Sequence, residues 1–226
     1  MRILVVAATS GELVPLVAKL GSASPRGDGL HRYGHAAHVV DVLISGVGMV
    51  ATAARCARVL TLAPYDLALN IGVCGSFDPD LQPGAVVHIV SDRVAELGAE
   101  DGDRFITIRE LGLLGDDEAP FTGGALVNAS PPANAALGIL PPVRGITVNT
   151  VHGNARSIAD VVRRFEPQIE SMEGAAFMYA CLVQKVAFAQ VRAVSNMVET
   201  RNRQAWKMAD AIGHASETAL SILDHV

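Results

Sequence analysis

The chain has 226 residues, of which half are hydrophobic, 18% are charged and 4% are aromatic. Small and aliphatic residues dominate, which excludes the disordered and fibrous classes of protein. The length suits one sizeable hydrophobic core, and no abrupt shift in composition marks a boundary, so we expect a single domain over residues 1–226. The formal net charge of −5 argues against a nucleic-acid partner, which usually binds a basic patch or stripe.

Two features of the sequence predict a cytoplasmic protein with no membrane partner. The apolar run near the N-terminus covers residues 3–8, which is too short for a signal-peptide core or a membrane span. The cysteines are odd in number and lie far apart without a CxxC pair, at Cys56, Cys74 and Cys181. This usage fits a reducing compartment better than a disulfide framework or a zinc site.

Short runs of Val, Ile and Leu alternate along the chain with segments whose apolar residues recur at helical spacing. In chain order, the patterns predict strand 3–8, helix 12–19, strand 39–44, helix 49–62, strands 67–71, 85–90 and 146–148, helix 158–165, strand 186–194 and helix 203–223. Segment 98–142 differs, since its DGD, GDDEAP and SPP clusters are typical of loops. The alternation predicts a mostly parallel or mixed sheet covered by helices.

Five polar or glycine-rich turns are expected at the ends of predicted strands, and they read ATSGE, SGVGMVAT, NIGVCGSF, NTVHGN and SNMVETRN. In open α/β sheets, ligands bind beyond the carboxyl ends of the strands, so we expect these turns to converge on one site. SGVGMVATA lacks the third glycine of a dinucleotide fingerprint, and no Walker loop is present. The glycines more plausibly let backbone amides approach a small ligand.

Metal and serine-hydrolase chemistry have little support in the sequence. His31, His35 and His38 have the spacing of one helical face, but Gly34 interrupts the run and no carboxylate or cysteine lies at ligand spacing. We therefore interpret this stretch as a solvent-facing hairpin with incidental histidines, and we expect no metal site. No serine lies in a GxSxG elbow.

The stretch IESMEGAAFMYA places the carboxylate of Glu173 between Met172 and the small residues that follow. One interpretation is a glutamate at a helix start, where the helix dipole favours negative charge. The other is a buried carboxylate with a functional role, because small neighbours let other backbone approach and a buried carboxylate needs hydrogen-bond donors. Glu12 and Glu173 are the strongest candidates for chemistry.

Six motifs together resemble the nucleoside phosphorylase and nucleosidase superfamily: MRILVVAATSGE, ISGVGMVATA, NIGVCGSF, VNTVHGN, ESMEGAAF and RAVSN. They are most like its hydrolytic branch, the methylthioadenosine/S-adenosylhomocysteine nucleosidases. Within that branch, DRVAELGAEDGDRF and SNMVETRN are similar to the futalosine hydrolases, which release hypoxanthine from futalosine in an alternative route to menaquinone. The resemblance covers nearly the whole chain. It implies a three-layer α/β/α sandwich with a mixed, partly barrel-like central sheet, no cofactor, and a purine nucleoside as substrate.

The resemblance also implies roles for individual residues. Glu12 would take a proton from the attacking water, and Glu173 would accept hydrogen bonds from the ribose hydroxyls while Met172 packs against the sugar. Asn196, supported by Ser195, would stabilise the departing purine. The residues implied to line the base are Val73, Cys74, Gly75, His152, Gly153 and Asn154.

Two departures from the family pattern bear on the substrate. Adenine-cleaving members have an aspartate where this chain has Asn196, and an amide with a fixed donor and a fixed acceptor favours a 6-oxopurine. Phosphorylases hold phosphate with arginines and a serine, whereas the matching positions here include Asn70 and Val73, so we expect water as nucleophile. The alternatives are an adenine-releasing methylthioadenosine/S-adenosylhomocysteine nucleosidase, a purine nucleoside phosphorylase, and a non-catalytic ligand-binding protein.

The 5′ substituent of the nucleoside requires a further, mostly apolar pocket. The family often completes this pocket from a neighbouring subunit, so the resemblance implies a homo-oligomer, a dimer or larger. The aromatic residues in the loop-rich segment 98–142 are Phe105 and Phe121. We expect the chain around them to reach into the site of a neighbouring copy.

Overall fold

The fold is built on a large mixed sheet, seen in a computed structural model that describes residues 1–200 and 202–226. Eleven strands belong to this sheet, and a separate hairpin carries two more. The strands are β1 (Arg2–Ala7), β2 (Ser24–Gly27), β3 (Leu30–His35), β4 (His38–Ile44), β5 (Leu67–Ser76), β6 (Val86–Val94), β7 (Gly98–Asp101), β8 (Arg104–Thr107), β9 (Phe121–Thr122), β10 (Ala125–Val127), β11 (Pro142–Thr147), β12 (Ile169–Ser171) and β13 (Phe188–Met197).

Part of the sheet closes on itself. The strand order is β2-β3-β4-β1-β5-β12-β11-β6-β10-β9, and β13 pairs with both β5 and β6. The pairing of β13 with β5 is parallel, and its pairing with β6 is antiparallel. Strands β5, β12, β11, β6 and β13 therefore form a closed ring, from which β1, β4, β3 and β2 continue as an open sheet.

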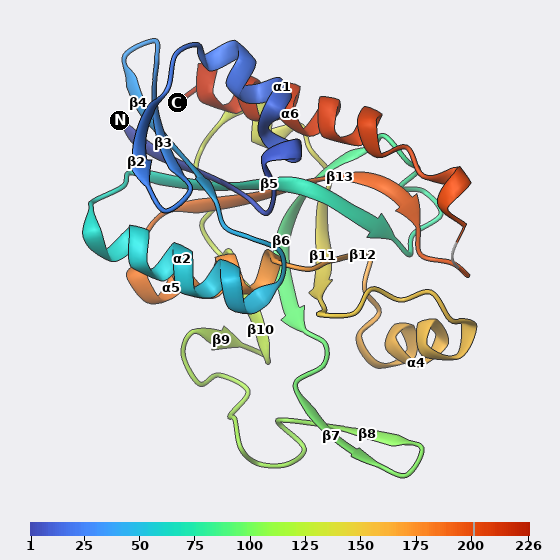
Figure 1. Ribbon diagram of the computed structural model, residues 1–226. Helices are drawn as coiled ribbons and strands as arrows, with labels where there is room; N and C mark the ends of the chain where they lie inside the picture. The colour runs from blue at the N-terminus through green and yellow to red at the C-terminus, as the bar shows by residue number, and fades with distance from the viewer. Residues whose placement is uncertain (201) are drawn as a thin grey trace.

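Helices cover the two faces of the sheet (Figure 1). One face carries α1 (Ser10–Leu20) and α6 (Met208–Asp224), with the short α3 (Ala135–Gly138) against α6. The other face carries α2 (Met49–Leu62) packed on α5 (Gly174–Gln184), while α4 (Ala155–Phe165) lies at the barrel end. Separate clusters of buried side chains fill the two interfaces. The predicted three-layer sandwich with a mixed, partly barrel-like sheet is confirmed.

Three sequence-based boundaries were wrong. NIGVCGS is not a turn, since β5 continues through it to Ser76, and its glycines face side chains packed against the strand. The predicted helix 203–223 is a 3-10 turn, η1 (Arg203–Ala205), followed by α6. Segment 98–142 holds the β7–β8 and β9–β10 hairpins and α3 among its loops. Short strands rich in polar residues have no apolar run by which to recognise them.

The histidine-rich stretch forms the hairpin that the sequence predicted. Strands β3 and β4 pair in register from Leu30 opposite Leu43 to His35 opposite His38. Ala36 adopts the left-handed conformation, φ 50°, at the tight turn between them. Over residues 1–200 and 202–226, no group of three His, Cys, Asp or Glu side chains is arranged to hold a metal ion.

A helix that crosses a lipid bilayer needs about 20 consecutive, mostly apolar residues. Among the described residues, none of the helices combines the length and the apolar character that such a crossing demands.

A buried carboxylate joins the open part of the sheet. Asp41 on β4 has no exposed surface and accepts hydrogen bonds from Arg2 at 2.8 Å, from Arg32 at 2.7 Å and from the Tyr65 hydroxyl at 2.8 Å. Burial alone would raise the pKa of Asp41, but the hydrogen bonds from Arg32, Arg2 and Tyr65 outweigh it and lower the pKa. The charged carboxylate therefore links β1, β3 and β4 to the start of β5.

Replacing Asp41 should destabilise the fold. We expect Asp41→Asn to lower the free energy of unfolding by about 3 kcal/mol, because it leaves two arginines without their shared counter-charge. Tyr65→Phe removes one hydrogen bond and should cost about 1 kcal/mol. Urea denaturation at neutral pH measures both variants. A loss for Asp41→Asn no larger than that for Tyr65→Phe would contradict the central role of the carboxylate.

Candidate active site

A cavity of about 400 Å³ opens at the carboxyl ends of β1, β4, β5 and β13, and all five predicted turns contribute to it. Its walls are mostly apolar, with Val47, Met172, Met208 and Ile212 among the side chains. The predicted site residues that line it are Glu12, Val73, Cys74, Gly75, Met172, Glu173, Ser195 and Asn196. Carboxylates and an amide are thus held in a pocket whose walls are otherwise mostly apolar.

Glu12 lies in the first turn of α1. Its Oε2 accepts hydrogen bonds from the backbone N–H of Thr9 at 2.9 Å and from the Thr9 hydroxyl at 3.0 Å, as in a capping box. Oε1 points to β5, where a Cβ added to Gly72 would lie 2.7 Å away. The helix start therefore orients the carboxylate and leaves one oxygen facing the cavity floor.

Glu173 precedes α5 as its N-cap, but its side chain makes no capping hydrogen bond. The first amides of the helix are satisfied by other groups, since Ser171 Oγ accepts from Gly174 N and Thr147 Oγ1 accepts from Ala175 N. Glu173 Oε1 instead accepts from the backbone N–H of Gly48 at 3.0 Å, across the cavity. The helix-dipole interpretation is therefore incomplete, because the carboxylate is directed away from its own helix.

Arg192 is a residue of this site that the sequence reasoning missed. Its guanidinium is fully buried, with Nη2 donating to Asn70 Oδ1 at 2.5 Å and Nη1 lying 3.7 Å from Glu173 Oε2. Within the described residues, Nη1 and Nε have no hydrogen-bond partner. A Cβ on Gly72 would collide with Nη1, so only glycine leaves room for this charge beside Glu12. Arg192 opens the RAVSN motif, which was the signal that could have revealed it.

Arg192 is a cation close to the positions that match the phosphate-binding residues of phosphorylases. This chain has Asn70 and Val73 at such positions, in place of the phosphate-binding side chains. Arg192 lies directly beside Asn70, but the carboxylates of Glu12 and Glu173 approach it from the cavity side. A phosphate dianion there would meet two negative charges. A neutral water molecule, by contrast, has a donor and acceptors available to it.

Asn196 is held in one orientation at the opposite side of the cavity. Its Nδ2 donates to the backbone carbonyl of Met197 at 2.9 Å, and a carbonyl can only accept, so the amide cannot be reversed. Its Oδ1 lies 2.8 Å from the Ser195 hydroxyl, which also lies 3.1 Å from the carbonyl of Cys74. One N–H and one lone pair of the amide remain for a ligand.

Cys74 supplies a buried part of the cavity wall. Burial raises the pKa of its thiol to about 12, and burial likewise raises the pKa of Cys56 to about 12 and that of Cys181 well above its ordinary value. All three cysteines are unpaired and buried. Cys74 therefore acts as an apolar side chain and not as a nucleophile.

The remaining predicted residues lie at the edge of this cavity or outside it. His152 borders a smaller recess with Gly75, Glu170 and Asn196, so it lies at the Asn196 side of the cavity. Asn154 accepts hydrogen bonds from Arg156 N and Ser157 N and caps α4. The structure does not bring Gly153 or Asn154 to the wall of the 400 Å³ cavity.

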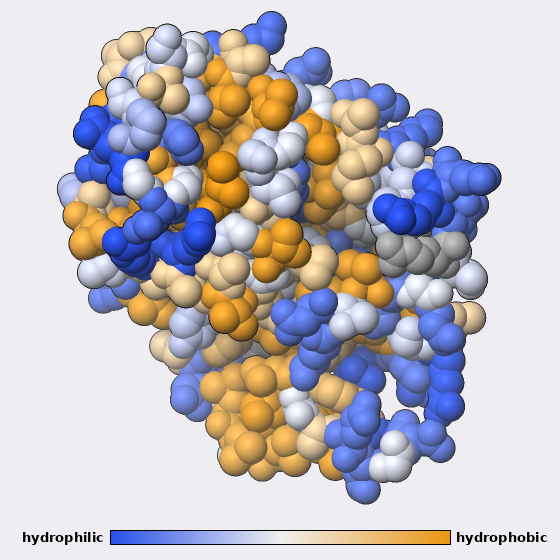
Figure 2. All heavy atoms as spheres, viewed as in Figure 1, coloured by the Kyte–Doolittle hydropathy of each residue, from blue (hydrophilic) through white to orange (hydrophobic). Residues whose placement is uncertain are grey.

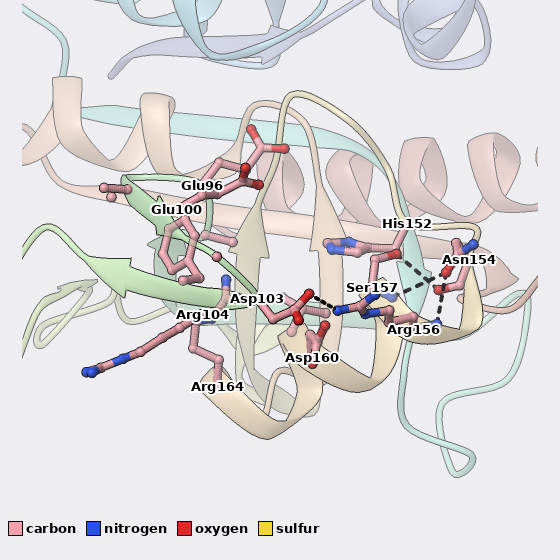
Figure 3. A pocket seen from close by; sticks show the side chains of 16 residues that line it. Glu96, Glu100, Asp103, Arg104, His152, Asn154, Arg156, Ser157, Asp160 and Arg164 are labelled. Atoms are coloured by element: carbon pink, nitrogen blue, oxygen red, sulfur yellow. Dashed lines mark hydrogen bonds and ion pairs between the residues drawn. The ribbon is translucent and has the colours of Figure 1, made fainter.

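Asn154 and His152 instead border a second, polar cavity of about 610 Å³, between the β7–β8 hairpin and α4 (Figure 3). Its charges largely offset one another, as in the Arg156–Asp103 ion pair. The Arg164 guanidinium stacks on the Phe105 ring, 4.0 Å from its centroid. The Phe121 ring contacts Tyr179. Both predicted aromatic residues therefore make contacts within their own chain, and neither lines the 400 Å³ cavity of that chain.

A buried network supports the start of α5 and thereby Glu173. Asp92 Oδ1 accepts from Thr147 Oγ1 at 2.9 Å, and its Oδ2 accepts from Gln190 Nε2 at 3.0 Å. A Cβ on Gly174 would collide with Gln190 Oε1 and Asp92 Oδ2, so glycine alone permits this approach. Burial raises the pKa of Asp92 to about 7, against the opposing effect of the Thr147 hydrogen bond.

Comparison with known proteins identifies the family of this chain. The family model described as "Phosphorylase superfamily" matches residues 2–226. The chain belongs to the phosphorylase superfamily. The futalosine hydrolase of Streptomyces coelicolor is 33% identical over 178 residues, covering 76% of this chain and 73% of that protein. The futalosine hydrolase of Acidothermus cellulolyticus is 32% identical over 213 residues, covering 92% and 85%.

A solved structure of the superfamily shows the same fold. The methylthioadenosine/S-adenosylhomocysteine nucleosidase of Colwellia psychrerythraea, in complex with adenine, superposes with a TM-score of 0.82 at 22% identity. The match covers 99% of this chain and 95% of that one. The family resemblance inferred from the sequence motifs is therefore confirmed.

The Asp92 network of this phosphorylase-superfamily protein should make stability depend on pH. The folded protein holds the Asp92 proton more tightly than the unfolded chain, whose pKa is near 3.8. This contribution to stability is complete below about pH 4 and is lost as the pH rises to about 7. The Asp92→Asn variant has no proton to lose at this position. We expect its free energy of unfolding to rise relative to that of the wild type by up to about 4 kcal/mol between pH 4 and pH 8.

Urea unfolding at a series of pH values measures this difference. The wild type and Asp92→Asn are compared by how their free energies of unfolding change with pH. Their absolute stabilities are not compared, since the Asp92→Asn substitution also alters two hydrogen bonds. Asp78→Asn is a control on a half-buried carboxyl whose pKa is lowered from 3.8. The free energy of unfolding of this variant should fall relative to the wild type as the pH rises, and mostly below about pH 4. Parallel pH curves for the wild type and Asp92→Asn would contradict a raised pKa of Asp92.

Proposed function

We propose that the cavity hydrolyses the N-ribosidic bond of a 6-oxopurine nucleoside, and that this nucleoside is futalosine. The observation that carries the proposal is the division of the cavity. Glu12 and Glu173, with the buried Arg192 guanidinium next to them, lie at one side, and the oriented Asn196 amide lies at the other. Identity of 33% and 32% to proteins named futalosine hydrolase supports the choice of substrate. The products are hypoxanthine and the dehypoxanthinyl sugar.

In the proposed reaction, water attacks C1′ of the ribose. Its oxygen bonds to C1′ while Glu12 takes a proton from it, and the electrons of the C1′–N9 bond pass to the purine, which takes up a proton at N7 from solvent water. The Glu12 carboxylate has a free Oε1 for this role, since both hydrogen bonds from Thr9 reach Oε2. Arg192, with Nη1 unpartnered among the described residues, is placed to orient the water.

Glu173 and Asn196 hold the two halves of the substrate. Among the described residues, Glu173 Oε2 makes no hydrogen bond and lies 3.7 Å from Arg192 Nη1, so it can accept from ribose hydroxyls. The free lone pair of Asn196 Oδ1 accepts from the protonated N7, and the free N–H of Nδ2 donates to O6. Holding both the ribose and the purine limits motions of the substrate that do not lead to cleavage of the C1′–N9 bond.

A chromatographic end-point assay tests the function. Futalosine, inosine and methylthioadenosine are offered separately, each with and without phosphate. We expect hypoxanthine from futalosine without phosphate. Release of adenine from methylthioadenosine would favour the nucleosidase alternative, and dependence on phosphate would favour the phosphorylase alternative. No product from any substrate would favour a non-catalytic binding protein.

Substitution of Glu12 tests the mechanism. Glu12→Gln should lower kcat by on the order of a hundredfold or more, because the amide cannot accept the proton from water. Glu217→Gln, the same change on an exposed residue of α6, is the matched control and should leave kcat unchanged. Near-full activity of Glu12→Gln would refute the role of general base.

We further propose that the chain forms a homo-oligomer. Figure 2 shows apolar atoms gathered over the segment between β8 and β9, with others over α2 and α5. The large apolar side chains exposed there include Leu113 at 72%, Val50 at 83% and Val183 at 51%. Monomers rarely expose so much contiguous apolar surface without a partner.

The oligomeric state can be measured directly. Light scattering after size exclusion should give at least twice the chain mass of 23.6 kDa. Val183→Asp places a charge on α5 and should shift the mass to that of a monomer. Lys185→Asp, a change of charge just beyond the same helix, serves as the control. A wild-type mass of one chain would contradict the proposal.

A further inference from the structure

Glu170 is a buried carboxylate to which the proposed mechanism gives no role. It lies on β12, is 4% exposed and lines the nucleoside cavity. Its Oε1 accepts from the backbone N–H of His152 at 3.0 Å, and its Oε2 lies 2.6 Å from His152 Nδ1. A carboxylate only accepts, so His152 carries a proton on Nδ1. Each carboxylate oxygen keeps a lone pair for a further donor.

Three neighbouring strands place Glu170 opposite Asn196. Gly75 on β5 pairs with Glu170 on β12 and with Asn196 on β13, so the three residues lie side by side across the sheet. The middle residue has no side chain. A Cβ there would lie 3.4 Å from Asn196 Nδ2, 3.6 Å from Glu170 Cγ and 2.8 Å from Val198 Cγ2. Val198 Cγ2 therefore packs over Gly75, and the amide and the carboxylate flank this position while both line the cavity.

The donors and acceptors of Asn196 and Glu170, on either side of Gly75, complement the hydrogen-bonding groups along one edge of a purine. From β13 to β12 the groups are the Asn196 carbonyl, the Asn196 amino group and the Glu170 carboxylate, which present an acceptor, a donor and an acceptor. A departing 6-oxopurine presents N7–H, the O6 carbonyl and N1–H in the same sequence, as donor, acceptor and donor.

We propose that Glu170 selects 6-oxopurines by accepting a hydrogen bond from N1–H. This inference rests on the proposed function for the position of the base and extends it with a second specificity residue. Asn196 alone reads N7 and the 6-substituent. Glu170 reads N1, which carries a hydrogen in hypoxanthine and guanine and a lone pair in adenine.

The same arrangement rejects adenine in two ways. The N1 lone pair of adenine would face a carboxylate, and the two repel each other. The nearby backbone N–H of His152, which could otherwise donate to N1, is already bound to Glu170 Oε1. Sites that leave buried polar groups unpaired in the wrong complex discriminate strongly.

Binding of free purine bases tests the inference independently of nucleoside hydrolysis. The dissociation constants of hypoxanthine, 1-methylhypoxanthine and adenine are measured by calorimetry for the wild type, Glu170→Gln and Glu170→Leu. In the wild type, hypoxanthine should bind on the order of ten to a hundredfold more tightly than 1-methylhypoxanthine, which lacks the N1 hydrogen. Glu170→Gln keeps the size of the side chain, so the steric effect of the methyl group remains while the charged acceptor is lost.

We expect the ratio of the dissociation constant of 1-methylhypoxanthine to that of hypoxanthine to fall at least about fivefold in Glu170→Gln. Glu170→Leu frees the His152 N–H and should tighten adenine relative to hypoxanthine. Glu199→Gln, an exposed carboxylate at the same recess, is the control and should keep the wild-type ratio. Near-ultraviolet circular dichroism verifies that each variant is folded. If Glu170→Leu does not fold, Glu170→Gln decides the result.

Several results would overturn the inference. A purely structural role for Glu170 would weaken hypoxanthine and 1-methylhypoxanthine by the same factor and leave their ratio unchanged. Hydrolysis of futalosine by the wild type together with an unchanged ratio in Glu170→Gln would reject the role of Glu170 and retain the proposed function. Absence of hypoxanthine binding to the wild type, with no futalosine hydrolysis, would reject both.

Discussion

The buried positive charge of Arg192 is the constraint on which the site depends. A fully buried guanidinium is costly unless opposite charges and hydrogen bonds compensate for it. Asn70 binds one end at 2.5 Å, and Glu173 lies 3.7 Å from the other. These partners come from β5 and the start of α5, so the charge fixes the position of the helix against the sheet. The space for it exists because position 72 is a glycine.

The cavity divides its chemistry between the helix starts and the strands. Glu12 and Glu173 belong to the first turn of α1 and the cap of α5, where few residues separate the carboxylate from a strand end. Asn196 and Glu170 belong to the strands themselves, where pairing with Gly75 sets their separation. The groups that we propose to distinguish one base edge from another are therefore held by paired strands of the sheet.

Much of this arrangement could be predicted from the sequence. Apolar runs identified the central strands, and alternation with helices identified the layers. Glu12, Glu173 and Asn196 were found because their motifs match a known family, and the cavity brings all three together. The glycines of β5 were misread as a turn, because the bulky side chains that pack over Gly72 and Gly75 come from distant segments.

The residues that were missed share a physical cause. Arg192 and Glu170 lie inside strands between buried residues, and local spacing does not show that a charged side chain there is also buried. Their roles depend on strand pairing, which joins residues that are far apart in the chain, as Glu170 and Gly75 are. Register of this kind becomes visible only when the sheet is assembled.

Burial of the cysteines has a consequence for experiments on this protein. Cys56 and Cys74 have pKa values of about 12, and the pKa of Cys181 is also raised, so at neutral pH each remains an unreactive thiol. A cysteine introduced at an exposed position, such as that of Ile139 just after α3, would then be far more nucleophilic than any native one. The native chain is already a suitable background for attaching a single spectroscopic label, with no cysteine needing removal.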